Sequence, residues 1–110
     1  THVVARKLDE TTLATAVERA EVLLHCTPVG MLPETERTLV PRGLLRPDLA
    51  VFDAVYNPRR TLLLKDAAAL GCRVVEGMEM FLGQAVVQFE LWTGNTAPVG
   101  AMRRVIEARL

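Results

Sequence analysis

Cysteine, lysine and aromatic residues are all scarce in this chain of 110 residues. Its two cysteines, Cys26 and Cys72, each lie in an expected strand, and neither forms a metal-ligand spacing with His2 or His25. Two isolated thiols argue against a disulfide scaffold and favour a reduced, cytoplasmic protein in which both cysteines are small buried hydrophobes. The composition therefore predicts no metal site and no disulfide.

Net charge and long apolar runs are also absent. The 13 basic and 13 acidic residues cancel, which argues against an electrostatic nucleic-acid or membrane partner. No apolar run approaches the ~18 residues of a spanning helix, and no signal peptide opens the chain, so we expect a soluble protein. The only dense basic spots, Arg59-Arg60 and Arg103-Arg104, are expected to be solvated surface.

What is present is enough apolar sequence for one core. Hydrophobic residues make up 50% of the chain, which argues against disorder. Caps mark two helices: Asp9 and Thr61 are expected N-caps, and Gly71 is an expected C′ residue. The expected strands are 2–6, 21–26, 50–56 and 72–75; the expected helices are 8–20, 61–71, 77–94 and one that Pro98 begins, with one short helical turn near 43–45.

Alternating strands and helices predict a parallel α/β sheet with right-handed crossovers. We expect a half-sheet over residues 1–76 and C-terminal helices over residues 77–110 of a single partial domain. Ligands of such sheets bind where the carboxyl ends of strands open into loops. The junctions at 27–31, 57–60 and 76–79 are therefore the candidate site.

Two of these junctions carry polar groups in an apolar setting. In "HCTPVGM", Thr27 and free backbone amides suit a nucleotide ribose or phosphate, although an ordinary Pro-Gly turn explains them equally well. In "FDAVYNP", Asp53 lies inside an apolar strand and Tyr56 at its end. The Tyr56 hydroxyl could hold a substrate oxygen, or the ring could simply close the end of the core.

The third junction opens the helix "GMEMFLGQAVVQFELWTG". Gly77 leaves room for a ligand, whereas Glu79 in the first turn opposes a phosphate and favours a flat neutral or cationic group. Gln84 and Gln88 could bond each other, one turn apart, or Gln84 could bind a polyhydroxylated ligand. They lie beside an apolar stripe that is expected to be core: Met78, Phe81, Leu82, Ala85, Phe89 and Trp92.

These motifs, in this order, resemble the C-terminal half of shikimate dehydrogenase. The resemblance covers about residues 20–94 and is most specific over 50–94, through Asp-x-x-Tyr-Asn-Pro and Gly-Met-x-Met-x-x-x-Gln-x-x-x-Gln-Phe-x-x-Trp-Thr-Gly. The form "GMEMFLGQ" looks most like enzymes fused to dehydroquinate dehydratase. A non-catalytic α/β module for assembly or small-molecule binding, or a relative of tetrahydrofolate dehydrogenase, are the alternatives.

The resemblance implies part of a Rossmann-like NADP-binding domain in a cytoplasmic enzyme of chorismate and aromatic amino-acid biosynthesis. That family reduces 3-dehydroshikimate to shikimate with NADPH. By resemblance, Tyr56 and Gln84 contact the ring hydroxyls of the substrate, and Thr27, Ala54 and Gly77 line the nicotinamide end of the cofactor. The chain departs from the family at Glu79, at Ala54 and at His25-Cys26, where Asn-Ala is usual, which leaves shikimate or quinate preference open.

The family's Lys-Asp catalytic pair and glycine-rich phosphate loop have no counterpart here, so no catalytic residue is assigned and the chain alone is expected to be inactive. In a sheet of order 3-2-1-4-5-6, residues 2–6 would have no neighbouring strand, and residues 21–26 would expose a bare edge. Such edges pair with other chains. We therefore expect either the missing N-terminal part of the enzyme or a second copy to cover this edge.

Overall fold

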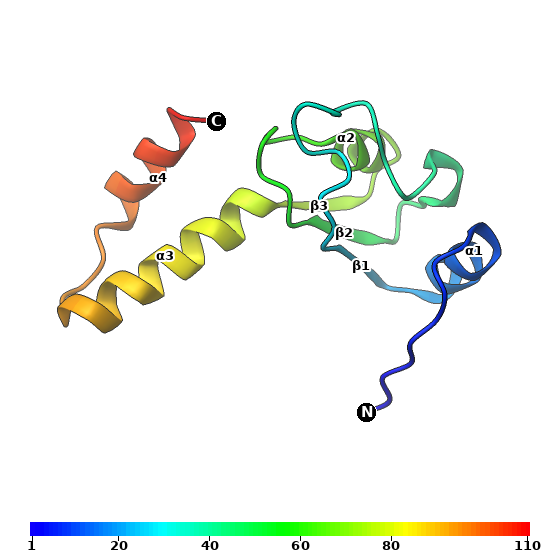
Figure 1. The fold of residues 1–110 in the computed structure, drawn as a ribbon, viewed down its shortest axis with the longest axis horizontal. Helices are drawn as coiled ribbons and strands as arrows, with labels where there is room; N and C mark the ends of the chain where they lie inside the picture. The colour runs from blue at the N-terminus through cyan, green and yellow to red at the C-terminus, as the bar shows by residue number, and fades with distance from the viewer.

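The computed structural model describes residues 1–110 and contains one parallel sheet of three strands. The strands are β1 (Val22–His25), β2 (Ala50–Asp53) and β3 (Arg73–Glu76), in the order β1-β2-β3 (Figure 1). Their register aligns the last residues of the three strands at the carboxyl-terminal end of the sheet: His25, Asp53 and Glu76. The predicted parallel α/β architecture is confirmed.

The helices follow the predicted caps. Asp9 accepts a hydrogen bond from the Thr12 amide at 2.9 Å, and Thr61 accepts one from the Leu64 amide at 3.3 Å. Gly71 has a φ of 83°, the left-handed conformation that a C′ glycine supplies. The elements are α1 (Glu10–Arg19), a 3₁₀ turn η1 (Arg42–Leu44), α2 (Leu62–Ala69), α3 (Gly77–Thr93) and α4 (Val99–Glu107).

The strand predicted at residues 2–6 is wrong. No strand forms there, and residues 1–9 are exposed, Val3 to 96%. The physical reason is the one the topology predicted: no neighbouring strand is present to complete a ladder, and a β-branched run alone does not form one.

The core lies on one face of the sheet. Leu23, Val51 and Val74 are aligned across the three strands and pack toward α1 and α2. On the opposite face Leu24 aligns with Phe52 and Val75, and Leu24 is 64% exposed. Continuous apolar strands are typical of sheets that are covered on both sides. This chain covers one side only.

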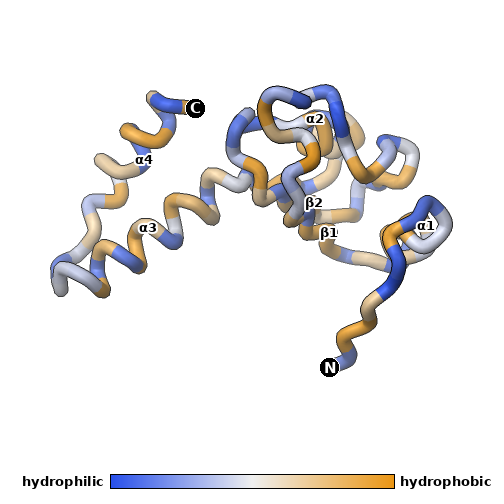
Figure 2. Tube along the Cα trace, viewed as in Figure 1, coloured by the Kyte–Doolittle hydropathy of each residue, from blue (hydrophilic) through white to orange (hydrophobic).

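Helix α3 begins at the end of β3 and projects away from the sheet, with α4 beside it (Figure 1). This projection gives a radius of gyration of 16.0 Å, against about 13 Å for a compact domain of this length. Met78 and Leu82 are buried, but Trp92 is 76% exposed. The apolar stripe of α3 is therefore fully buried only in its first turns, Phe81, Ala85 and Phe89 are half-buried, and hydrophobic positions, orange in Figure 2, continue along the helix.

The two cysteines have different environments. Cys72 is buried, as predicted, and its thiol donates to the Arg46 carbonyl at 3.1 Å. The prediction that Cys26 is buried is wrong, because this residue lies one position beyond the end of β1, where the chain has left the sheet. None of the helices combines the length and hydrophobicity needed to cross a membrane.

Candidate functional site at the carboxyl ends of the strands

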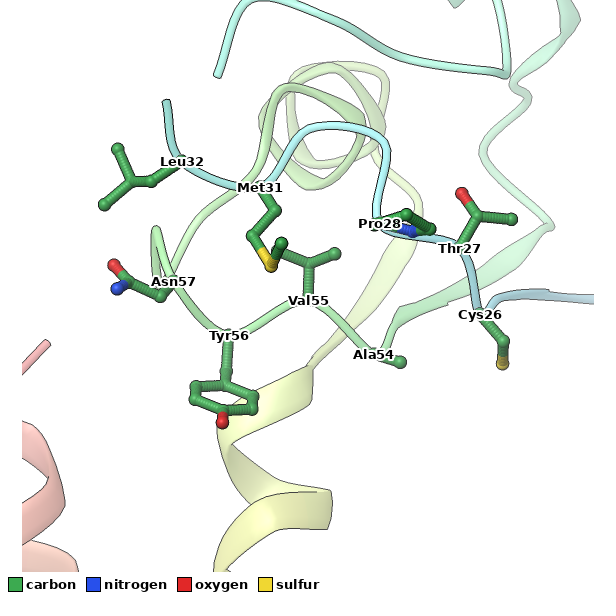
Figure 3. Close-up of a pocket in the computed structure, with 9 residues that line it drawn as sticks. All are labelled: Cys26, Thr27, Pro28, Met31, Leu32, Ala54, Val55, Tyr56 and Asn57. Atoms are coloured by element: carbon green, nitrogen blue, oxygen red, sulfur yellow. The ribbon is translucent and has the colours of Figure 1, made fainter. Parts of the chain in front are cut away.

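A pocket of about 400 Å³ lies where β1 and β2 end (Figure 3). One wall is the segment after β1, and the other is the segment after β2. The lining residues are Cys26, Thr27, Pro28, Met31, Leu32, Ala54, Val55, Tyr56 and Asn57. The first junction singled out in the sequence thus forms one wall, and Ala54–Asn57, which ends at the start of the second junction, forms the other.

A buried carboxylate lies at the end of β2, immediately before the pocket wall that begins at Ala54. Asp53 is fully buried and accepts three hydrogen bonds: from His25 Nδ1 at 2.8 Å, from the Val55 amide at 3.0 Å and from the Thr61 hydroxyl at 2.6 Å. Buried carboxylates are costly unless they are paired and hydrogen-bonded. Here the same contacts also fix the backbone that leaves β2 and forms one wall of the pocket.

His25 connects this carboxylate to the pocket. The ring is buried, and its second nitrogen, Nε2, lies 2.5 Å from the hydroxyl of Thr27. Thr27 also accepts a hydrogen bond from the Val29 amide at 3.3 Å. Sequence reasoning noticed His25 only as a departure from the family pattern and missed this role. The signal was the polar pair His25 and Asp53, each at the carboxyl end of an apolar strand.

Tyr56 links the pocket to α3. Its ring stacks on Phe81 with a centroid separation of 4.7 Å and an interplanar angle of 21°. Gln84 lies three residues beyond Phe81 and is therefore its neighbour on the helix surface. Gln84 and Gln88 are exposed, and no hydrogen bond joins them, so the alternative in which they bond each other is wrong.

Gly77 has a packing role that the sequence did not reveal. It is buried, and a Cβ placed on it would lie 2.6 Å from the carbonyl oxygens of both Asp53 and Ala54. The start of α3 therefore contacts the end of β2 backbone to backbone. Of the three positions predicted to bind the cofactor, Thr27 and Ala54 line the pocket, whereas Gly77 supports the wall from behind.

An ion-pair cluster holds the third junction. Glu76 binds Arg59 at 2.7 Å and Arg60 at 3.0 Å, and Arg59 also reaches Glu107 of α4 at 3.7 Å. Burial alone would raise the pKa of Glu76, but the hydrogen bonds from both guanidinium groups outweigh it and lower the pKa below its ordinary value of 4.5. Arg59 and Arg60 are partly exposed, as predicted, but they also form ion pairs that hold the end of β3.

The neighbouring Glu79 is neutralised in the same way. Arg103 of α4 binds both of its carboxylate oxygens, at 2.6 and 2.9 Å. This hydrogen bonding lowers the pKa of Glu79 against a smaller opposing effect of burial. The Glu79 carboxylate therefore forms an ion pair with α4. This pairing weakens the repulsion that we predicted it would exert on a phosphate.

We expect Glu76→Gln to lower the free energy of unfolding by about 1–2 kcal/mol near pH 7. Because folding lowers the pKa of Glu76, its contribution is present above the unfolded pKa near 4.5 and is lost as the pH falls through the folded-state pKa. Urea unfolding of both proteins at a series of pH values measures this difference. It should shrink in acid, and a constant difference would contradict the assignment. Glu36→Gln, at an exposed carboxylate, is the control.

Comparison with known proteins agrees with this arrangement. Residues 77–107 match the family model described as the shikimate 5'-dehydrogenase C-terminal domain. A shikimate dehydrogenase (NADP⁺) of Dehalococcoides mccartyi is 44% identical over 104 residues, which cover 94% of this chain and 36% of the relative. The chain thus spans about a third of the length of the curated relatives that it matches.

Solved structures give the same result. A Thermus thermophilus shikimate 5-dehydrogenase in complex with NADP(H) and shikimate has a TM-score of 0.80 at 31% identity, over 89% of this chain and 37% of that one. A Corynebacterium glutamicum quinate dehydrogenase in complex with NAD has a TM-score of 0.82 at 36% identity, over 91% and 35%. Over most of its length the chain therefore matches shikimate dehydrogenases, and its residues 77–107 match their C-terminal domain.

Proposed function

We propose that this chain is the C-terminal part of an NADP-dependent shikimate dehydrogenase, an oxidoreductase that reduces 3-dehydroshikimate to shikimate in aromatic amino-acid biosynthesis. The observation that carries the proposal is the pocket at the ends of β1 and β2, with Tyr56 between it and α3. Relatives that match the chain over 94% of its length carry this name. Its two free thiols suit a reducing compartment, the cytoplasm.

The residues present fit one end of the cofactor. The pocket is lined mainly by apolar side chains, which suits a flat ring, and Thr27 adds a hydrogen-bonding group. In our proposal Thr27 and Ala54 hold the nicotinamide end, Ala54 through its backbone, and Gly77 supports Ala54 from behind. The bound cofactor supplies the hydride. Tyr56 and Gln84 hold hydroxyl groups of the substrate, and the C-terminal helices face the substrate.

The remaining parts of the enzyme lie outside this chain in our proposal. The catalytic Lys-Asp pair and the phosphate-binding loop belong to the N-terminal part. The exposed apolar face around Leu24 and the free edge of β1 are where that part would pack. If the chain is produced alone, we expect self-association through this edge, which sedimentation would detect.

The test of the proposed function is an assay of the full-length protein with shikimate and NADP⁺, following formation of NADPH. Parallel assays with quinate and with NAD⁺ decide the preference that the sequence left open, since one similar structure is a quinate dehydrogenase with NAD. The alternative, a non-catalytic α/β module, predicts binding without turnover. Absence of turnover with every pair of substrate and cofactor would refute the proposal, and binding without turnover would favour the alternative.

We expect Gln84→Ala to raise the KM of the full-length enzyme for shikimate and to lower kcat/KM by the equivalent of about 1–3 kcal/mol, because a substrate hydroxyl loses its partner. Gln88→Ala is the matched control: the same residue type, also exposed, one turn farther from the strand ends. Initial rates at varied shikimate concentration measure both. Equal effects of the two substitutions would remove Gln84 from the site.

A further inference from the structure

A continuous chain of side chains runs from the core to the pocket. Asp53 contacts His25 at 2.8 Å, and His25 contacts Thr27 at 2.5 Å. Asp53 and His25 are 0% and 6% exposed, whereas Thr27 is half-buried and lines the pocket. The only other histidine, His2, is exposed near the start of the chain. The buried side chains of Asp53 and His25 are therefore connected to the hydroxyl group of Thr27 at the pocket wall.

The positions of the protons follow from counting donors and acceptors. A carboxylate has only acceptors, so all three partners of Asp53 must donate, and the hydrogen on His25 lies on Nδ1. In a neutral imidazole the other nitrogen is then an acceptor. With His25 neutral, Nε2 accepts and the hydroxyl of Thr27 donates its only proton inward.

This arrangement leaves the Thr27 oxygen with acceptor capacity alone. A hydroxyl has one proton and two acceptor positions. The proton is committed to His25, and the Val29 amide occupies one acceptor position at 3.3 Å. One acceptor position remains, on a side chain that lines the pocket. A ligand N–H or O–H can use it, while a carbonyl or phosphate oxygen would meet an oxygen with no proton to offer.

We propose that His25 is a positioning residue that fixes Thr27 as a hydrogen-bond acceptor, and that Thr27 thereby selects a ligand with an N–H or O–H donor at this end of the pocket. The inference rests on the proposed function, in which the nicotinamide end of the cofactor enters here. The donor is then the amide N–H of the nicotinamide carboxamide.

The test is a double-mutant cycle on cofactor binding by the full-length protein, measured by NADPH titration. His25→Asn keeps an amide donor for Asp53 but removes the atom that reaches Thr27, and Thr27→Val removes the hydroxyl. We expect His25→Asn to weaken NADPH binding about 3- to 10-fold when Thr27 is present. In the Thr27→Val background it should have almost no further effect. An equal loss in both backgrounds would overturn the proposal.

Two controls separate positioning from general damage. Thr27→Ser retains the hydroxyl and should keep NADPH affinity within about twofold of the unmutated protein, and His2→Asn should change nothing. A loss with Thr27→Ser as large as with Thr27→Val would mean that the methyl group, and not the hydroxyl, matters, which contradicts the proposal.

A second measurement does not depend on ligand binding and is made on the unmutated protein. Nitrogen-15 shifts of the unmutated protein distinguish a protonated from an unprotonated imidazole nitrogen, and His25→Asn serves only to assign the signals. We expect a protonated Nδ1 and an unprotonated Nε2. Protonation of both nitrogens, with Thr27 then free to donate, would overturn the inference. If NADPH does not bind at all, the proposed function fails. The nitrogen-15 shifts still decide whether the Thr27 hydroxyl donates to His25 or accepts from it.

Discussion

Asp53→Ala is expected to cost about 3–5 kcal/mol of the free energy of unfolding. The carboxylate is 0% exposed and is the shared acceptor of three donors, so its removal leaves His25 Nδ1–H, the Val55 amide and the Thr61 hydroxyl with no partner. No buried side-chain polar atom lacks a partner in the unaltered structure. The substitution would therefore create several unpaired groups at a site that water does not reach.

Urea unfolding of the full-length protein measures this loss. Asp53→Asn should cost less, because its amide oxygen still accepts from His25 and Val55, and only the Thr61 hydroxyl must reorient. Asp48→Ala is the control, since that carboxylate is 75% exposed and pairs with Arg46 at the surface; it should change stability by less than about 1 kcal/mol. Equal effects at positions 53 and 48 would contradict the assigned role of the buried carboxylate.

Local signals made most of the fold predictable from the sequence. Asp9, Thr61 and Gly71 act on backbone groups within a few residues, and each does so in the structure as expected. The strands β1 and β2 were also recognisable, because short continuous apolar runs between polar or turn residues are typical of parallel strands. Signals of this kind need no knowledge of the rest of the chain.

The parts that escaped prediction depend on distant partners. Residues 2–6 have a strand composition but no neighbouring strand, and the outer turns of α3 have a core composition but only α4 beside them, so that Trp92 stays exposed. The contact between His25 and Asp53 joins residues 28 apart in the sequence and requires the exact register of β1 on β2. A single sequence identifies both polar residues but does not specify that register.

The role of Gly77 illustrates how such a contact can be misread. From the sequence, a glycine at the start of a helix suggests ligand binding, because the missing side chain lets a ligand approach the backbone closely. In the structure a Cβ at this position would lie 2.6 Å from two backbone oxygens and 2.8 Å from the Ala54 carbonyl carbon. Backbone atoms in a buried strand end cannot move aside as the tip of a flexible side chain can. Packing alone therefore requires glycine here.

We accordingly expect Gly77→Ala to destabilise the protein by about 2–4 kcal/mol, through overpacking of α3 against the end of β2. Gly83→Ala is the matched control in the same helix: a Cβ there meets nothing within 4 Å, and alanine should stabilise the protein by about 0.5–1 kcal/mol through helix propensity. Urea unfolding together with NADPH titration of the full-length protein separates the two roles of Gly77. If its only role were to admit a ligand, Gly77→Ala would bind NADPH weakly yet unfold like the unmutated protein. Loss of stability without ligand instead means that the same contact holds Ala54 in the wall of the pocket, so that the packing of α3 shapes the site before any ligand arrives.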